Sequence, residues 1–289
     1  MASALRQRLL RAVIYEDNHL VALNKWRGLA VQDAAGSPST VLSNVDVFQQ
    51  NKDGFVPRLA HRLDQNTTGV LVLAKTAEAV LRLNRLFQLG AVAKTYEAVL
   101  AGQVTKPTGT LKGIPELITE EEDANSELTS NQPLFKTSAS WSHSTAQSHY
   151  TVLASAQVND GRPSRTKPWL TRVELRPTTG YKHQLRIQCA DGLRAPVLGD
   201  KRYGGGQEQV SPIILQHLQR HGLRTAAHPY GLVMHLHAKQ LVIPGYNWDG
   251  SDLVLRATLP DHMQLTIDAC GLHPDQQSRP TRQPTRQTA

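Results

Sequence analysis

The most constraining feature of the sequence is the uninterrupted apolar stretch 70–74, Val-Leu-Val-Leu-Ala, which follows a polar turn at 66–69. A strand with one face in water alternates apolar and polar residues, so a strand without polar positions needs both faces covered. The stretch therefore predicts a buried strand in a sheet that carries structure on each side. Arg62 and Asp64 lie just before this stretch. A salt bridge on the surface would not need a position next to a buried strand.

Other apolar segments are short and alternate with turn signals. We predict strands at 13–15, 20–24, 96–100, 149–153 and 170–175, a late hairpin from 233–237 and 240–243, and a helix over 77–89. Thr76 can cap that helix and Gly90 can end it. Glu78 and Arg82 can pair across one helical turn. Every apolar run is shorter than the roughly 20 residues that a membrane-spanning helix needs, so no membrane role is expected.

The charge of the chain favours a polyanionic partner. The 289 residues carry a formal net charge of +8, although six acidic residues gather between Glu116 and Glu127 without a basic one among them. The remainder is therefore more basic than the whole. Lys and Arg hold phosphates whatever the base sequence, so nucleic acid is one interpretation of this surplus and simple solubility is the other. Two cysteines are too few for a disulfide framework and fit a reducing compartment.

Four segments are expected to be additions to a single domain at 13–272. Residues 1–12 form a short basic leader, either an ordinary first helix or a mitochondrial transit peptide. Surface insertions span about 106–146 and 205–230. Residues 273–289 have too little apolar surface to fold and are expected to be a disordered basic tail.

Asp64 has two interpretations. An Asp before a turn is commonly an Asx-turn or N-cap residue, but a strand rather than a helix follows here. Arg62 lies two residues earlier, and therefore on the same side of an extended chain. This placement favours a reactive carboxylate beside a basic side chain.

A second basic cluster is the segment 179–186, Thr-Gly-Tyr-Lys-His-Gln-Leu-Arg. Thr179-Gly180 can open a helix on which His183 and Arg186 share a face. A helix start of this kind can hold phosphate through its N–H groups. A solvated basic helix end is the alternative.

Taken together, these segments resemble one family. The stretch HRLDQNTTG at 61–69 is similar to the His-Arg-Leu-Asp-x-x-Thr-Ser-Gly motif of the RluA-type pseudouridine synthases. Four further segments resemble family motifs and occur in the family's order, the first of them before this stretch and the other three after it: VIYEDNHLVALNKWRGLAVQ, KTYEAVLAG, GYKHQLRIQCADGLRAPVLGDKRYGG and MHLHAKQL. The resemblance covers roughly residues 13–272 and is strongest to the mitochondrial members. The departures are Thr68 for Ser, Trp26 for Pro and Tyr181-Lys182 for Arg-Thr, none of them at a position that bears the chemistry.

The resemblance implies an isomerase that converts uridine in RNA to pseudouridine. The N1–C1′ glycosidic bond breaks, the uracil rotates and C5 forms the new bond, so neither a cofactor nor a metal is needed. Asp64 is the implied catalytic carboxylate, acting either as nucleophile or as base. Arg186 would keep Asp64 ionised, and Tyr96 would stack on the flipped uracil.

The same resemblance implies contacts with RNA. Arg62 would bind the backbone or fill the gap that the flipped nucleotide leaves. The other predicted RNA-binding residues are His61, Thr68, Lys182, His183, Lys201 and Arg202. For His61 we favour a hydrogen bond to the backbone that shapes the loop. For Lys201 and Arg202 a plain surface loop is the alternative.

The implied fold is α/β, a bent and mainly antiparallel sheet with flanking helices and a central RNA-binding cleft. Ribosomal RNA is the expected substrate, with tRNA or mRNA as alternatives, and a ribosomal assembly particle is a candidate partner. The expected compartment is the mitochondrial matrix, with the cytoplasm as the alternative. A competing hypothesis is an RNA-binding ribosome-assembly factor that keeps the fold without catalysis. A nucleoside glycosidase is disfavoured because the motifs contain no second acid.

Several other side chains with reactive groups are expected to be structural. His235 and His237 could bind a metal, but alternate histidines on a strand more commonly serve the fold. Cys189 and Cys270 have no neighbour in the sequence that suggests an activated nucleophile, so we expect core thiols.

Overall fold

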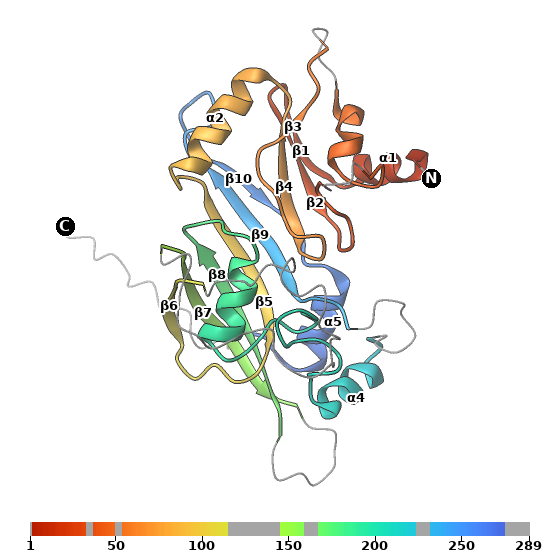
Figure 1. Ribbon diagram of the computed structural model, residues 1–289, viewed down its shortest axis with the longest axis vertical. Helices are drawn as coiled ribbons and strands as arrows, with labels where there is room; N and C mark the ends of the chain where they lie inside the picture. Colours follow the sequence, from red (N-terminus) through yellow and green to blue (C-terminus); the bar gives the residue numbers. More distant parts are fainter. Residues whose placement is uncertain are drawn as a thin grey trace, which may run out of the picture.

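One ten-stranded sheet organises the part of the chain that the structure describes (Figure 1). The computed structural model describes residues 2–32, 37–49, 54–114, 145–158, 167–223 and 232–274. The strands are β1 (Val13–Glu16), β2 (Leu20–Lys25), β3 (Arg58–Leu59), β4 (Thr68–Ala74), β5 (Ala93–Ala101), β6 (Thr108–Lys112), β7 (Gln147–Gln157), β8 (Trp169–Pro177), β9 (Leu236–Ile243) and β10 (Leu253–Arg256). The helical segments are α1 (Ala2–Arg11), η1 (Leu42–Phe48), α2 (Ala77–Gln88), α3 (Gln184–Ile187), η2 (Gln188–Gly192), α4 (Pro212–Arg220) and α5 (Asp261–Ala269).

The strand order is β1-β2-β4-β9-β5-β8-β7-β6, with β3 beside β4 and β10 beside β9. The named strands pair antiparallel except β4 with β9, where Thr68 faces His237 and Gly69 faces Ala238. The mainly antiparallel sheet with flanking helices that the resemblance implies is confirmed. Because β1, β2 and β3 pair with the rest of the sheet only through β4, the short β4–β9 contact joins its two parts.

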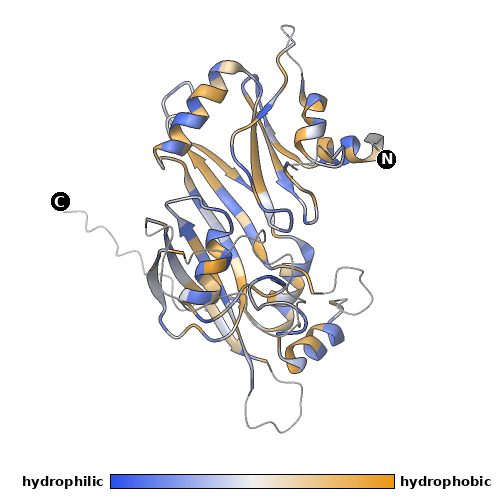
Figure 2. Ribbon diagram, in the orientation of Figure 1, coloured by the Kyte–Doolittle hydropathy of each residue, from blue (hydrophilic) through white to orange (hydrophobic). Residues whose placement is uncertain are grey.

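The strand β4 is buried along its whole length, as its apolar sequence predicts. Val70 and Val72 belong to a core cluster that includes residues of α2, on one face of the sheet. Leu71 and Leu73 belong to a second cluster that includes residues of α1 and η1, on the other face. Figure 2 shows β4 largely in the colour of hydrophobic residues, whereas the helices carry both colours.

The helix α2 begins and ends where the sequence predicts. The Thr76 hydroxyl accepts a hydrogen bond from the first turn, and Gly90 follows the helix with a φ of 66°. The predicted ion pair between Glu78 and Arg82 does not form. Arg82 instead donates to the carbonyl of Gly245, in the connection between β9 and β10.

The predicted late hairpin is wrong. Residues 236–243 form one continuous strand, β9, and its hairpin partner is β10, which the sequence analysis did not identify. The apolar residues at 233–237 and 240–243 look like two strands because His237, Lys239 and Gln240 interrupt them. The interruption is tolerated because β9 lies between β4, β5 and β10, whose side chains and carbonyls satisfy these polar groups.

The two predicted insertions contain regular structure. Residues 108–112, inside the first one, form β6 and pair with β7, so this part belongs to the sheet. The second contains α4, which packs beside α5. Most of the first insertion, part of the second and nearly all of the predicted tail lie outside the described residues.

The predicted leader segment is a helix that packs on the domain. Leu9 of α1 is fully buried in the cluster beneath β4. The Arg8 guanidinium lies 4.1 Å from the centre of the Trp26 ring, and Arg6 forms an ion pair with Asp46. Neither α1 nor any other helix in the described ranges is long and apolar enough to span a membrane.

The junction of β4 and β9 leads to a prediction about Gly69. Its φ is 111°, and a Cβ there would lie 2.2 Å from the carbonyl oxygen of Ala238. Gly69→Ala should therefore lower the free energy of unfolding by about 1–3 kcal/mol more than Gly28→Ala does. Gly28 is the matched control because it also has a positive φ, 78°, but open space around it. Urea denaturation of both variants measures the difference, and equal destabilisation would contradict close strand contact at Gly69.

Candidate active site

A cleft of about 590 Å³ lies where the segment before β4 meets α3. Its walls come from the 60–64 segment, the end of α2, the first half of β5, the turn 177–181 and the residues 183–186. The cleft brings together Arg62, Asp64, Tyr96 and Arg186, which the family resemblance implies act together. The Asp64 side chain is 23% exposed and can be reached from solvent.

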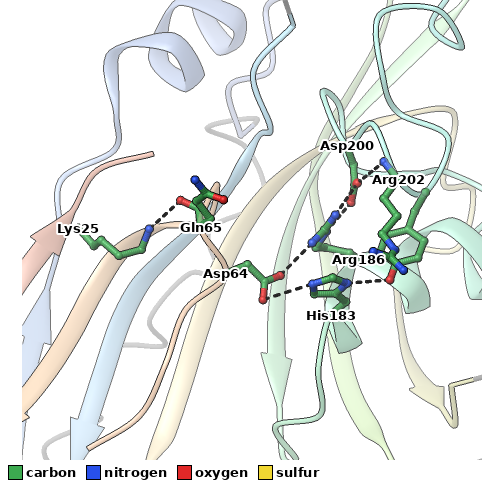
Figure 3. A network of polar contacts seen from close by, with 8 residues as sticks. Lys25, Asp64, Gln65, His183, Arg186, Asp200 and Arg202 are labelled. Carbon is green, nitrogen blue, oxygen red and sulfur yellow. Dashed lines mark hydrogen bonds and ion pairs between the residues drawn. The ribbon is translucent and has the colours of Figure 1, made fainter. Parts of the chain in front are cut away.

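Asp64 is bonded to Arg186 across the cleft. Arg186 Nη1 donates to Asp64 Oδ2 at 3.1 Å, although the residues are 122 positions apart in the chain. On its other side, Arg186 donates from Nε and Nη2 to the two carboxylate oxygens of Asp200, at 2.7 and 2.8 Å. Figure 3 shows this chain of contacts from Asp64 through Arg186 to Asp200. A bidentate bond of this kind fixes the plane of the guanidinium, so the direction of Nη1 is set before Asp64 is bound.

The charge of Arg186 is secure in its buried setting. Burial opposes the charged form, but the hydrogen bonds and charge of Asp200, and then the charge of Asp64, raise the pKa of Arg186 above its ordinary value. Its guanidinium also lies 4.9 Å from the centre of the Tyr203 ring. Asp200 is almost fully buried, so Arg186 and Asp200 form a compact ion pair beneath the cleft.

The segment 179–186 differs from the predicted helix. The helix α3 begins only at Gln184, and the preceding residues form a turn. The Gln184 carboxamide holds that turn, since its oxygen accepts from the Thr179 hydroxyl at 2.7 Å and the Tyr181 N–H at 3.1 Å. Its nitrogen donates to the Ser148 hydroxyl of β7 at 2.9 Å. This turn directs His183 and Arg186 into the cleft.

A buried lysine supports the backbone next to Asp64. Lys25 is fully buried at the end of β2, and its Nζ donates to the carbonyls of Trp26, Leu29 and Gln65 at 2.9–3.2 Å. Burial lowers the pKa of Lys25 to about 7, and the charge of Asp64 offsets part of this effect. The bond to Gln65 ties the loop that carries Asp64 to β2 (Figure 3).

Tyr96 and His61 are neutral walls of the cleft. Burial, followed by the charge of Asp64, raises the pKa of Tyr96, so its phenol stays protonated. Burial and the charge of Lys94 lower the pKa of His61 to about 4. The Val72 N–H donates to His61 Nε2 at 3.1 Å, which confirms the backbone hydrogen bond that we favoured.

The remaining predicted RNA-binding residues lie outside the lining of the cleft, in different settings. Thr68 does not face the cleft, because it is buried at the β4–β9 junction and its hydroxyl shares a hydrogen bond of 2.8 Å with His237. Lys182 and Lys201 are exposed beside the site, and Arg202 is partly buried next to Tyr203. These three are not among the residues that line the cleft.

The other histidines and the cysteines take structural roles. The ring nitrogens of His235 contact the Val233 carbonyl and the Thr266 hydroxyl. His235 and His237 are both fully buried. Cys189 is buried and Cys270 is partly buried, and burial raises the pKa of both thiols to about 12. Among the described residues no group of three or more His, Cys, Asp or Glu side chains could hold a metal ion.

Sequence reasoning missed two residues of the site, Asp200 and Lys25. Asp200 follows Gly199 in a turn, a setting in which Asp is common, so its type gave no signal. The available clue was that a buried arginine needs acceptors for its N–H groups, so that Arg186 requires a second carboxylate besides Asp64. For Lys25, the clue was its place at the end of an otherwise apolar strand.

The chain is similar to known proteins over almost its whole length. Residues 19–191 match the family model described as RNA pseudouridylate synthase, a range that contains Asp64, Tyr96 and Arg186. The mitochondrial pseudouridylate synthase RPUSD4 of Rattus norvegicus is 30% identical over 286 residues, which are 93% of this chain and 72% of that protein. Its counterpart in Xenopus tropicalis is 33% identical over 273 residues, 90% of this chain and 81% of that protein. Ribosomal large subunit pseudouridine synthase D of Vibrio cholerae is 33% identical over 201 residues, 67% of this chain and 52% of that protein.

Solved structures agree with the sequence comparison. The human RNA pseudouridylate synthase domain containing 4 superimposes with a TM-score of 0.70 at 26% identity, covering 93% of this chain and 97% of that one. The match of fold and the match of sequence therefore extend over the same domain. From the family model, the similar sequences and the solved structure, we conclude that this chain belongs to the RNA pseudouridylate synthase family and is an RNA pseudouridine synthase.

Proposed function

We propose that this enzyme isomerises a uridine of ribosomal RNA, with Asp64 as its catalytic carboxylate. The observation that carries the proposal is the Asp64 side chain, which is accessible from the cleft and bonded to the buried Arg186 at 3.1 Å. An accessible carboxylate with a fixed cation behind it suits a reaction at a sugar carbon, because the charge needed for the first step is already present.

Asp64 can start the reaction in two ways. It can attack the target nucleotide and displace the uracil, or it can remove a sugar proton so that the uracil leaves. Both routes use the Asp64 carboxylate, which the Arg186 guanidinium contacts at 3.1 Å. In both, the freed uracil must stay in the cleft, rotate and present C5 to the sugar.

Tyr96 suits the role of holding the uracil. It lies on β5 in the wall of the cleft, and its phenol is protonated at neutral pH. An aromatic ring that stacks on a base contributes about 1–3 kcal/mol, and the hydroxyl can pass a proton at C5. Arg62 is exposed on the same wall and would bind the backbone or replace the flipped nucleotide in its stack. Lys182, Lys201 and Arg202 would bind phosphates around the cleft.

The choice of ribosomal RNA and of compartment is supported by the names of similar proteins. The relative from Vibrio cholerae is named for the large ribosomal subunit, and those from rat and frog are named mitochondrial. We propose mitochondrial ribosomal RNA as the substrate in the matrix, and a ribosomal assembly particle as the setting in which it is met. tRNA and mRNA, and the cytoplasm, are the alternatives.

Asp64→Asn should abolish pseudouridine formation, with a loss of at least about 10²–10⁴-fold in rate, because the amide has no charge for either route. The measurement is chemical mapping of pseudouridine in RNA incubated with the purified protein. Asp249→Asn is the control, since Asp249 lies in the exposed connection between β9 and β10. Full activity of Asp64→Asn would refute the assigned role.

Arg186→Lys should reduce the rate by about 10- to 100-fold, because a lysine cannot bind both oxygens of Asp200 and still reach Asp64. The matched control is Arg172→Lys. Arg172 also pairs with a buried carboxylate, Glu97, but outside the cleft. Thermal unfolding and activity are measured for both. We expect both variants to lose stability but only Arg186→Lys to lose activity once folded, and an equal loss of activity would contradict the assignment.

Loss of the gene should remove pseudouridine from one or a few uridines of organellar ribosomal RNA. A transcriptome-wide pseudouridine map with and without the gene measures this. Losses confined to tRNA or mRNA would overturn the proposed substrate. Expression of Asp64→Asn in cells that lack the gene distinguishes catalysis from a non-catalytic role in ribosome assembly. Restored assembly without pseudouridine would show that RNA binding alone is the essential task.

A further inference from the structure

His183 lies between the catalytic carboxylate and a buried tyrosine, yet the proposed mechanism does not use it. Its Nε2 is 3.8 Å from Asp64 Oδ1, and its Nδ1 is 2.7 Å from the Tyr203 hydroxyl. The side chain is only 14% exposed. Figure 3 shows the imidazole of His183 beside the Asp64 carboxylate, on the same side of the carboxylate as Arg186.

The backbone of His183 is unusual as well. Its φ is 56°, and Arg194 is the other non-glycine residue with a positive φ in the described ranges. The left-handed conformation costs about 1–2 kcal/mol for a residue with a Cβ, and residues held in it concentrate at functional sites. A glycine would adopt it without this cost, so the backbone alone gives no reason for a histidine here.

The charge of Asp64 selects the tautomer of the imidazole. A lone pair on Nε2 would face the carboxylate and be repelled, whereas an N–H on Nε2 is attracted to it. With the proton on Nε2, Nδ1 is the acceptor and the Tyr203 hydroxyl is the donor. Burial raises the pKa of Tyr203, so this hydroxyl keeps its proton.

The neutral form of His183 fits this arrangement. Burial lowers its pKa to about 4, which the charge of Asp64 opposes, while the charges of Arg186, Arg202 and Lys182 lower it further. The imidazole therefore offers a polar N–H to Asp64 without adding a cation. A cation would bind the carboxylate more tightly and reduce its reactivity.

We propose that His183, oriented by Tyr203, is a positioning residue that holds the Asp64 carboxylate in its reactive rotamer. This inference rests on the proposed role of Asp64. Arg186 donates to Oδ2, and Nε2 of His183 lies 3.8 Å from Oδ1, so each carboxylate oxygen faces one of the two residues and rotation of the carboxylate is limited. His183 would then act on the rate of the chemical step rather than on the affinity for RNA.

The test is single-turnover pseudouridine formation, together with RNA binding by filter retention, on an RNA that the wild-type protein modifies. Tyr203→Phe keeps the ring beneath Arg186 but removes the donor to Nδ1, and should lower the rate constant about 10-fold. His183→Gly suits the backbone and should lower it by about 10- to 100-fold, with the dissociation constant for RNA within about twofold of wild type. Arg194→Gly makes the same backbone change away from the cleft, and should leave both quantities unchanged.

Two conservative variants sharpen the result. His183→Gln sets an amide nitrogen near the position of Nε2 and should recover part of the rate, whereas His183→Asn reaches only the position of Nδ1 and should not. Weaker RNA binding with a normal rate constant in His183→Gly would show a direct RNA contact and overturn the proposal. A wild-type rate in Tyr203→Phe would overturn it too.

The ¹⁵N shifts of the imidazole make the inference separable from the proposed function. In wild type they should report a neutral ring with the proton on Nε2, and in Asp64→Asn a mixture of tautomers. If this result is obtained but Asp64→Asn is fully active, the role of Asp64 fails and the contact stands. A proton on Nδ1 in the wild-type protein overturns the inference directly.

Discussion

The site depends on one guanidinium shared by two carboxylates. Asp200 is almost fully buried, and an unpaired charge there would be costly, so its two bonds to Arg186 stabilise an otherwise unfavourable group. Once that pair is formed, its net charge is close to zero. One N–H of Arg186 remains directed at Asp64, and the negative charge that is left over belongs to the residue exposed to the cleft.

This arrangement exists only because two parts of the sheet are held together. Asp64 precedes β4, in one part, while Arg186 lies on α3, which packs on the other. The parts join through the parallel contact of β4 with β9, where Gly69 allows the strands to approach and Lys25 anchors the loop after Asp64. The precision of the Asp64–Arg186 distance is therefore a property of the whole sheet.

Local patterns predicted the elements that depend on local interactions. The helix α2, with Thr76 and Gly90 at its ends, and the buried β4 follow from capping and apolar content. The meeting of Asp64 with Arg186 came from resemblance, since no local rule relates residues 122 positions apart. The continuity of β9 and the role of Asp200 were missed for one reason: their polar groups are satisfied by distant partners, which a single sequence does not reveal.

The charges around the cleft also decide which part of a nucleotide can enter it. A phosphate approaching Asp64 would be repelled, and Arg186 is already occupied by two carboxylates. Two cations are exposed to solvent here: Arg62, in the wall of the cleft, and Lys182, beside it. This separation favours phosphates at the rim and a base with its sugar inside, which is the orientation of a nucleotide rotated out of its helix. A cleft lined only with cations would bind RNA more tightly, but it would hold the backbone where the uracil has to turn.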